Sequence, residues 1–159
     1  MEYKDPVICG IDPGLTGALA FICDDVVEVE DMPTVANPTG KGRVVQEHSV
    51  AHILKEYNPH LVIIEKQQAM PGQGVSSMFK IGEGYGILKG VCAALDLRTR
   101  IITAPTWKRA SGLIGKEKDA SRGLAMQLWP SQTDFFVRRK DHGRADAALI
   151  AKYGKDALV

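Results

Sequence analysis

Apolar residues come in short uninterrupted runs over the first part of the chain. Residues 7–11 and 17–23 are almost entirely apolar, and the runs end at the turn-forming residues Asp12-Pro13-Gly14 and Asp24-Asp25. Residues 26–29 add valines interleaved with a polar residue. Such runs, bounded by Pro, Gly and Asp, are typical of strands joined by tight turns. We therefore predict three strands in an antiparallel meander, and a mobile loop over residues 34–43, which contain Pro, Asn, Gly and Lys.

Helical and strand-like segments then alternate. Residues 44–57 have a helical apolar face and stop at Asn58-Pro59, whereas residues 61–64 are all apolar, as in a strand buried on both faces. A long helix (76–95), a fifth strand (100–103) and helices near 105–110, 118–128 and 143–153 follow. This order predicts an α/β fold: a ribonuclease H-like mixed five-stranded sheet, with parallel strands added to the meander and helices on both faces. We expect one domain over residues 1–159.

Carboxylates stand at the ends of two strands and near the start of the last helix. Asp12 follows the first strand and Glu65 the fourth, and in a sheet of this order these strands are neighbours. Asp141, His142 and Asp146 come together later, with His142 and Asp146 at i, i+4 on one helix face. Oxygen-rich ligands at a sheet edge suit Mg²⁺ or Mn²⁺. Two such ions can support phosphodiester hydrolysis.

Each acid also has a structural explanation. Asp-Pro-Gly is common turn chemistry, Glu65 suits an ion pair at a strand end, and Asp141 suits a helix cap. Burial of an unpaired charge costs several kcal/mol, however, so an acid directly after a buried strand calls for a partner. A shared site explains the acids together better than three separate structural roles.

Four segments in this order resemble the RuvC-type Holliday junction resolvases of the ribonuclease H-like superfamily, in the branch that includes the chloroplast junction resolvase and its bacterial and phage relatives. The segments are residues 10–19 (GIDPGLTGAL), 62–66 (VIIEK), 82–86 (GEGYG) and 140–147 (KDHGRADA), with 105–108 (PTWK) as a further match. The resemblance spans nearly the whole chain. It implies a crossover junction endodeoxyribonuclease, a metal-dependent enzyme that resolves four-way DNA junctions by paired nicks.

The resemblance also implies roles for single residues. Three carboxylates would bind Mg²⁺ or Mn²⁺, with two ions in each active site: Asp12, Glu65 and Asp146. The resolvases place an acid or a histidine three positions before the last Asp, where this chain has Gly143. We expect His142 to substitute as the fourth ligand, because the i, i+4 spacing keeps it on the same helix face, and Asp141 is the alternative. Lys118 would lie near the scissile phosphate as a further catalytic residue.

Basic residues concentrate in the last third of the chain, although the net charge is only +1. A basic face on an otherwise balanced protein is typical of DNA binding, although any single lysine more often belongs to a solvated helix face. The loop after Glu65 is a second candidate, because Gln can read base edges and Met can wedge between bases. The alternative is a flexible connection. The candidate DNA-binding residues are Lys66, Gln67, Gln68, Met70, Lys108, Lys116, Lys118, Arg122, Arg138, Arg139 and Lys140.

Gly82, Gly86 and Gly90 form one small-residue stripe on the long predicted helix. A glycine in a helix costs ~1 kcal/mol relative to alanine, so the stripe needs a reason. It permits close helix approach, and the resemblance implies that this helix packs against its counterpart in a homodimer. Twofold symmetry would match a four-way junction. The alternative is close packing on the chain's own sheet.

Composition excludes several other classes. The 159 residues are 45% hydrophobic and 25% charged, which suits a folded domain, and no apolar stretch reaches the ~20 residues of a membrane span. Three scattered cysteines and the lack of a visible signal segment lead us to expect a cytoplasmic protein with no membrane partner. An actin-like nucleotide-binding protein needs two domains, so we expect no nucleotide cofactor. The alternative function is another ribonuclease H-like nuclease, acting on RNA–DNA hybrids or other branched DNA.

Overall fold

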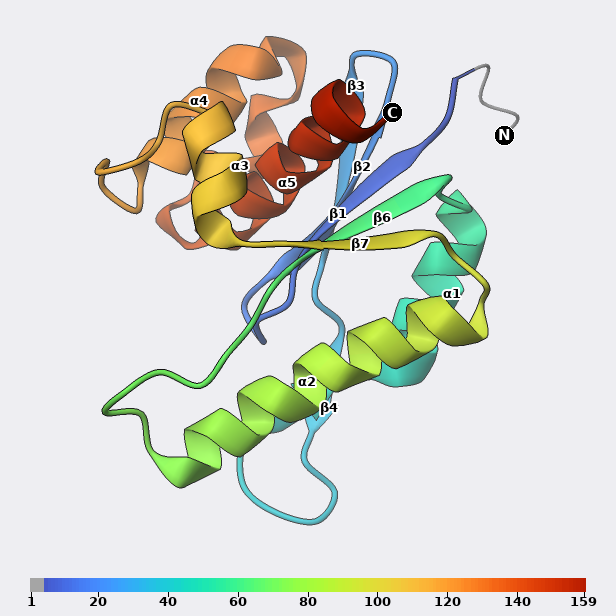
Figure 1. Ribbon diagram of the computed structural model, residues 1–159, viewed down its shortest axis with the longest axis vertical. Coiled ribbons are helices and arrows are strands. Elements are labelled where there is room, and N and C mark those ends of the chain that lie inside the picture. The colour runs from blue at the N-terminus through green and yellow to red at the C-terminus, as the bar shows by residue number, and fades with distance from the viewer. Residues whose placement is uncertain (1–4) are drawn as a thin grey trace.

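The computed structural model describes residues 5–159 (Figure 1). A five-stranded sheet forms its centre, with the strands in the order β3-β2-β1-β6-β7. β1 pairs antiparallel with β2 and parallel with β6, while β3 extends the antiparallel side and β7 the parallel side. The predicted mixed sheet is confirmed. Its strands are β1 (Ile8–Asp12), β2 (Ala18–Cys23), β3 (Val26–Asp31), β6 (Leu61–Glu65) and β7 (Thr99–Ile102).

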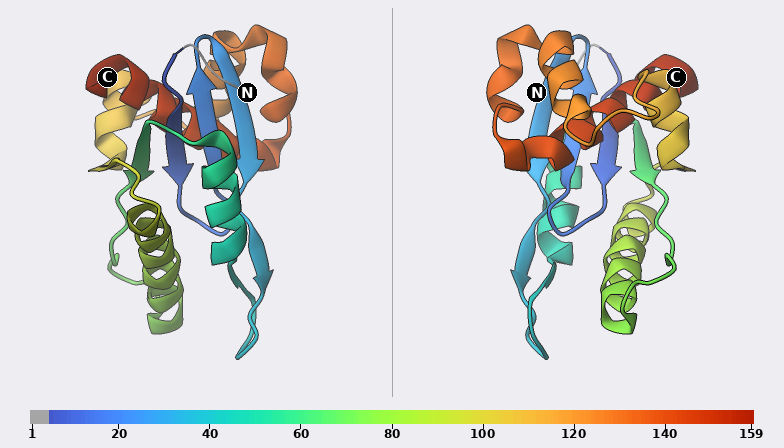
Figure 2. Two further views of the ribbon diagram at one scale, coloured as in Figure 1. Left: turned by 90° about the vertical axis from the view of Figure 1, so that its right-hand side faces the viewer. Right: turned by 90° about the vertical axis from the view of Figure 1, so that its left-hand side faces the viewer.

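Helices cover both faces of the sheet (Figures 1 and 2). α1 and α2 lie on one face, and α3, α4 and α5 lie on the other, with two short 3-10 helices between α4 and α5. The helices are α1 (Glu47–Tyr57), α2 (Val75–Ala94), α3 (Ala104–Ala110), α4 (Ala120–Leu128), η1 (Pro130–Phe135), η2 (Arg139–Asp141) and α5 (His142–Leu158).

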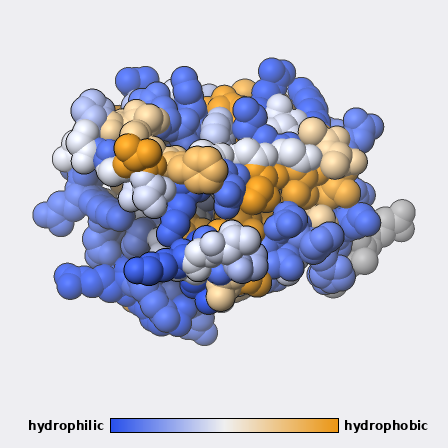
Figure 3. Space-filling view, turned by 90° about the horizontal axis from the view of Figure 1, so that it is seen from below, coloured by the Kyte–Doolittle hydropathy of each residue, from blue (hydrophilic) through white to orange (hydrophobic). Residues whose placement is uncertain are grey.

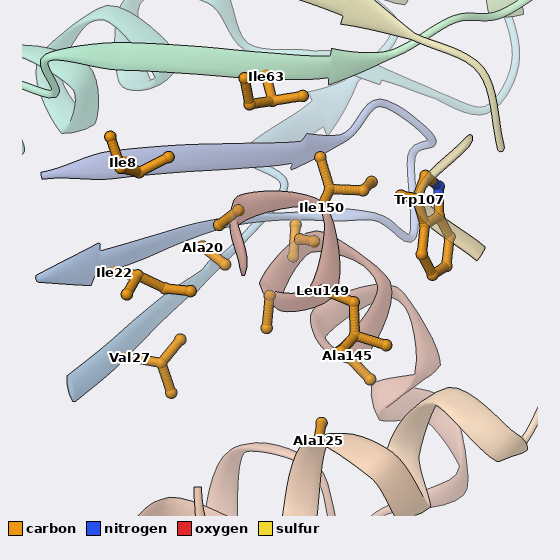
Figure 4. Packing of buried hydrophobic residues seen from close by; sticks show 14 of the residues in the cluster. Ile8, Ala20, Ile22, Val27, Ile63, Trp107, Ala125, Ala145, Leu149 and Ile150 are labelled. Atoms are coloured by element: carbon orange, nitrogen blue, oxygen red, sulfur yellow. The ribbon is translucent and has the colours of Figure 1, made fainter. Parts of the chain in front are cut away.

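The sheet separates two hydrophobic cores. In β6, Leu61 and Ile63 pack in the core beneath α5, whereas Val62 and Ile64 pack in the core beneath α1 and α2. All four side chains are fully buried, which confirms the prediction of a strand buried on both faces. Figure 4 shows the first of these cores, with Ile63 and its neighbouring strand residues on the side of the sheet where Ile150 of α5 lies.

Small residues let α5 lie directly against the central strand. A Cβ atom on Gly10 of β1 would come within 2.3 Å of the Ala147 carbonyl oxygen, and one on Gly154 within 2.6 Å of the Ile63 side chain. Ala147 and Ala151 are fully buried. This contact fixes the first turns of α5 beside the end of β1.

The prediction of a mobile loop over residues 34–43 is wrong, because this segment belongs to a hairpin. β4 (Thr34–Ala36) pairs antiparallel with β5 (Arg43–Val45), and residues 37–42 form the tip. The Pro, Asn and Gly residues that suggested a loop lie in or beside this tip, while each paired strand is only three residues long. A pairing this short leaves no periodic pattern in the sequence.

Helix boundaries also differ from the prediction, and α4 begins at Ala120 rather than at residue 118. α1 begins at Glu47 rather than at residue 44, because the preceding residues belong to β5 and the Gln46 side chain accepts a hydrogen bond of 2.7 Å from the Ser49 backbone N–H. α5 extends to Leu158, beyond the predicted end at residue 153.

The cysteines of the chain are buried free thiols, as predicted. In the part of the chain that the structure describes, no helix is long and apolar enough to cross a membrane. The expected lack of a signal segment concerns the start of the chain, and residues 1–4 lie outside the described part.

Candidate active site

β1 and β6 end side by side, and each ends on a carboxylate. The parallel register pairs Ile11 with Ile64, so the next residues, Asp12 and Glu65, share one edge of the sheet. Asp146 lies in the second turn of α5, the helix that packs against β1. The structure therefore brings near one another three acids that are far apart in the sequence.

Burial and mutual repulsion raise the pKa values of both aspartates. Burial is the largest cause for Asp12, whose pKa rises to about 7; the Asp146 and Glu65 carboxylates raise it further, and the Gly14 backbone N–H opposes them. Burial is also the largest cause for Asp146, whose pKa rises to about 6, and Glu65 again adds to the rise. The three acids thus form one electrostatic unit, whose repulsion a bound cation would relieve.

Glycines let the chain close around Asp12. A Cβ on Gly17 would lie 2.0 Å from the Asp12 carbonyl oxygen. A Cβ on Gly143 would lie 2.5 Å from the Thr16 carbonyl oxygen and 3.3 Å from Asp12 Oδ2. The first turn of α5 therefore rests directly on the turn between β1 and β2. This contact explains the glycine at position 143, because backbone occupies the space that an acid or a histidine would need.

Two side chains to which the sequence assigned no role hold the carboxylates. The Trp107 indole Nε1, in α3, donates a hydrogen bond of 2.6 Å to Glu65 Oε2, and Trp107 is fully buried. Ser121, in α4, is 3% exposed; its hydroxyl donates a hydrogen bond of 3.3 Å to the Lys118 carbonyl oxygen and acts to lower the pKa of Asp146 against the effect of burial. The one sequence signal for Trp107 was its place in the Pro-Thr-Trp-Lys match.

Asp141 is committed to arginines rather than to the acid cluster. It is 1% exposed, accepts hydrogen bonds from the Arg138 backbone N–H at 2.9 Å and from Arg138 Nε at 3.1 Å, and lies 3.8 Å from Arg144. Burial acts to raise its pKa, but the hydrogen bonds and charges of these arginines outweigh it and the pKa is lowered. Its side chain does not cap α5. We therefore leave Asp141 out of the candidate metal ligands.

His142 is half-buried, and the positive charges of Lys118 and Arg122 act on it. Its Nδ1 is the one buried side-chain nitrogen or oxygen within residues 5–159 that has no hydrogen-bond partner. Burial, followed by the positive charges of Lys118 and Arg122, lowers the pKa of His142, with Asp119 opposing them. The lowered pKa favours the neutral ring, in which one nitrogen carries a lone pair.

A pocket of about 330 Å³ opens beside Asp146. Lys108, Lys116 and Lys118 line it together with Trp107, and the charges of Lys108 and Lys118 act to lower the pKa of Asp146. None of these lysines forms an ion pair with an acid of the described chain. Glu117 also lines the pocket, so three lysines outnumber its two acids, Glu117 and Asp146. Cations next to the acid cluster suit a phosphate group.

The other predicted DNA-binding cations fall into two groups. Arg122 donates hydrogen bonds to Asp119 and to the Val137 carbonyl, and Arg138 forms an ion pair with Asp141. Both arginines therefore stabilise the connection between α4 and α5, and the structure does not offer them as free contacts. Among the other predicted DNA-binding cations, the exposed ones without an ion pair in the described chain are Lys66, Arg139 and Lys140.

The loop that follows Glu65 lies over the same edge of the sheet. Gln67 turns back, with its Nε2 at 3.4 Å from Glu65 Oε1, whereas Gln68 and Met70 are exposed, Met70 by 51%. The loop lines a second pocket of about 240 Å³ with Glu65 and Pro105. Its residues are therefore next to the acid cluster, as expected from the sequence.

The glycine stripe of α2 faces away from the sheet. Gly82, Gly86 and Gly90 are exposed, and a Cβ on any of them would meet no atom of the described chain within 4 Å. Phe79 and Val75, on the same side of the helix, are 71% and 80% exposed. Figure 3, seen from the side where α2 projects, shows apolar patches between hydrophilic side chains. Packing of these glycines on their own sheet is therefore excluded.

The acid cluster fits a divalent cation by donor type and charge. Its donors are carboxylate oxygens, which Mg²⁺ and Mn²⁺ prefer. Within residues 5–159, no three His, Cys, Asp or Glu side chains already lie close enough to share one ion. Glu65 is instead held by Trp107. Cation binding would therefore draw the carboxylates closer together.

The strand order and the mixed pairing define a ribonuclease H-like fold, with acids at the ends of β1 and β6 and on α5. No protein-family model matches the chain. The chain is 35% identical over 101 residues to the chloroplastic Holliday junction resolvase MOC1 of Chlamydomonas reinhardtii. That match covers 60% of this chain and 11% of the relative, so the chain spans about a tenth of the length of that protein.

Solved structures that share the fold include two resolvases. One is T. thermophilus RuvC in complex with a Holliday junction substrate, with 16% identity and a TM-score of 0.60, covering 92% of this chain and 90% of that one. The other is the yeast mitochondrial Holliday junction resolvase Ydc2, with 19% identity and a TM-score of 0.56, covering 95% of this chain and 78% of that one. The resemblance inferred from the sequence is confirmed at the level of the fold.

Proposed function

We propose that this protein is a metal-dependent endonuclease that resolves four-way DNA junctions by paired nicks. The observation that carries the proposal is that Asp12 and Glu65, at one sheet edge, lie near Asp146 of α5, where burial and then mutual repulsion raise the pKa of both aspartates. The names of the similar proteins, all Holliday junction resolvases or RuvC, support the choice of substrate.

The three carboxylates are the proposed ligands of Mg²⁺ or Mn²⁺. Two such ions, when bound, supply an activated water and charge stabilisation for the leaving oxygen. His142 is the proposed fourth ligand, because its lowered pKa favours the neutral ring and its Nδ1 has no partner in the described chain. Lys118, with Lys108, holds the scissile phosphate in the pocket beside Asp146. Trp107 orients the Glu65 carboxylate through its indole N–H.

The exposed cations around this site are the proposed contacts to the DNA backbone. Lys116 lines the phosphate pocket, and Arg139 and Lys140 precede α5 on the exposed surface. Lys66 follows Glu65 directly. Gln68 and Met70, exposed in the adjoining loop, reach toward base edges.

The outward face of α2 is the proposed dimer interface. Three glycines there contact nothing in the described chain, and Phe79 and Val75 beside them expose most of their apolar surface. A second copy of α2 can approach the glycines closely and cover Phe79. Two active sites related by a twofold axis would then face two strands of one junction.

Cleavage of synthetic substrates tests this function. We expect the wild-type protein with Mg²⁺ to cut a four-way junction in two strands, and to leave linear duplex and RNA–DNA hybrid of the same sequence intact. Preferential cutting of the hybrid would support the other ribonuclease H-like nuclease instead. His142→Ala and Asp141→Asn, assayed in Mg²⁺ and Mn²⁺, test the fourth ligand. An active His142→Ala with an inactive Asp141→Asn would contradict our assignment.

A further inference from the structure

A small hairpin outside the predicted DNA-binding set carries uncompensated positive charge. Lys41 lies in its tip, and Arg43 begins β5. Lys80, from the first half of α2, donates a hydrogen bond of 3.2 Å to the Lys41 carbonyl oxygen. None of the three cations forms an ion pair with an acid of the described chain. We call this group the basic hairpin: residues 34–45 together with Lys80.

The tip of the basic hairpin is ordered by its own contacts. Asn37 Oδ1 accepts hydrogen bonds from the Thr39 backbone N–H at 3.1 Å and from the Thr39 hydroxyl at 3.3 Å. The Asn37 backbone N–H donates to the Gly42 carbonyl. Arg43 donates two hydrogen bonds across the strands to Thr34. The charges of Arg43 and Lys80 are therefore held in place before any partner binds, which lowers the entropic cost of binding.

The basic hairpin lies at the same end of the molecule as the acid cluster. Gly84 of α2 packs between Val45 of β5 and the turn after Asp12: its Cβ would lie 3.3 Å from Val45 and 3.9 Å from the Pro13 carbonyl oxygen. Lys80 precedes Gly84 by four residues, about 6 Å along the helix. Figure 2 shows the hairpin and the first half of α2 extending beyond the sheet on the same side.

The opposite end of the sheet presents several exposed acids, and Lys155 donates a hydrogen bond to the Asp24 carbonyl oxygen among them. The turn between β2 and β3 holds Asp24 and Asp25, and Glu28 and Glu56 line a pocket beside it. A polyanion would therefore be repelled from that end and attracted to the end with the acid cluster and the basic hairpin. The basic hairpin extends the cationic surface to the α2 side of the acids, opposite the lysine pocket on the α5 side.

We propose that the basic hairpin is a second DNA-backbone contact, which binds phosphates a few nucleotides away from the scissile one. The proposal rests on the proposed function and adds to it a surface on the other side of the acid cluster. A nucleic-acid strand rises about 3.4 Å per nucleotide, so a strand that passes Asp12 reaches Lys80 and Lys41 within a few nucleotides. The hairpin and the lysine pocket then hold the strand on both sides of the cleavage site.

Junction binding by the variant Lys41→Ala/Lys80→Ala tests the proposal. We measure the Kd for a four-way junction without divalent metal, over a series of salt concentrations, and the cleavage rate at saturating protein. We expect the Kd to rise at least about fivefold and the slope of log K against log salt to fall by about one for each lysine removed. We expect the saturated cleavage rate to stay within about twofold of wild type, because neither lysine contacts the acids.

The control variant is Lys55→Ala/Lys152→Ala, which removes two lysines from the C-terminal halves of α1 and α5; Lys152 is ion-paired with Asp156 at 2.6 Å. We expect its Kd and salt slope to match those of wild type. Wild-type affinity and salt slope in Lys41→Ala/Lys80→Ala would overturn the proposal, as would equal losses in both double variants. Loss of the dimer in the hairpin variant, seen by light scattering, would make the hairpin a protein interface and also overturn it. Failure of the wild-type protein to bind junction DNA would instead refute the proposed function.

Discussion

Two helices of this protein carry small residues along one face, and they use them in opposite ways. α5 buries its alanines and glycines against the central strand so closely that a Cβ on Gly10 of β1 would meet the backbone of Ala147 at 2.3 Å. α2 turns Gly82, Gly86 and Gly90 outward, where they contact nothing in the described chain. Small residues therefore permit close packing within the chain in α5, whereas the glycines of α2 remain exposed on the surface.

This difference coincides with a division of function. α5 carries Asp146, and its close contact with β1 holds that carboxylate near Asp12. α2 carries no member of the acid cluster, and its exposed face instead combines glycines with Phe79. Changes in α5 and beneath it should therefore affect chemistry and stability, whereas changes on the outer face of α2 should affect association.

The largest effect is expected from Asp146→Asn on α5. Loss of one stabilising group from a preorganised site lowers the rate by about 10²-fold or more, so we expect cleavage to fall below detection. Junction binding should be kept or strengthened, because a negative charge near phosphates is removed. Glu83→Gln, an exposed carboxylate on α2, is the matched control and should cleave normally. Single-turnover cleavage and junction binding check both; an active Asp146→Asn would remove this residue from the site.

The next effect is expected where α5 meets β1. Gly10→Ala places a methyl group against the backbone of α5, which cannot move as a side chain can. Overpacking of this kind costs about 3 kcal/mol, so we expect that loss in the free energy of unfolding measured with urea. Gly123→Ala in α4, where a Cβ meets nothing within 4 Å, is the control and should be neutral or stabilising. An unchanged urea midpoint for Gly10→Ala would show that α5 lies further from the sheet.

The burial of Asp12 and its repulsion by Asp146 and Glu65 predict how the metal-free protein responds to pH. Because the folded state raises the pKa of Asp12 from 3.8 to about 7, the folded state binds the proton more tightly than the unfolded chain. The free energy of unfolding should therefore fall as pH rises from about 4 to about 7, by on the order of 3 kcal/mol.

Urea denaturation in EDTA at pH 5 and pH 8 checks this response. Asp12→Asn should flatten the pH dependence and raise stability at pH 8, whereas Asp25→Asn, an exposed residue in the turn between β2 and β3, should not. Mg²⁺ at pH 8 should restore stability in the wild type, because it binds the folded state. A wild-type protein equally stable at both pH values, and unaffected by Mg²⁺, would argue against clustered acids.

The sequence predicts those parts of the fold and site that a run of neighbouring residues records. The uninterrupted run in β6 and its closing Glu65 predicted a strand buried on both faces with an acid beside Asp12, because parallel neighbours end at one edge. The hairpin of β4 and β5 was missed, since each strand is three residues long. The contact between Trp107 and Glu65 joins residues 42 positions apart, so no local pattern records it. The ion pairs of Asp141 with Arg138 and Arg144 were not predicted. The sequence alone does not distinguish an acid that pairs with neighbouring arginines from one that binds a metal ion.

A smaller effect is expected from Trp107→Phe. Phenylalanine keeps the buried ring but removes the N–H that holds Glu65 Oε2. Loss of a group that orients a metal ligand typically costs 10- to 100-fold, so we expect about a tenfold weaker apparent affinity for Mn²⁺, measured by calorimetry, with a matching rise in the Mn²⁺ concentration needed for cleavage. Trp129→Phe, a buried tryptophan away from the acids, should leave the Mn²⁺ affinity unchanged. Equal affinities in both variants would limit Trp107 to a packing role.

The smallest effect on the folded chain, and the most selective, is expected from Gly86→Leu on α2. No atom of the described chain lies within 4 Å of the new Cβ, and leucine is a better helix former than glycine by about 1 kcal/mol. The thermal midpoint should therefore not fall, although a leucine in a close glycine interface prevents two copies of α2 from meeting. We expect a monomer by light scattering at concentrations where the wild type is a dimer, with loss of paired nicking. Gly123→Leu in α4, equally free of contacts, should remain dimeric. A dimeric Gly86→Leu would place the interface elsewhere, and the outward glycines of α2 would lose the function that distinguishes them from those packed against α5.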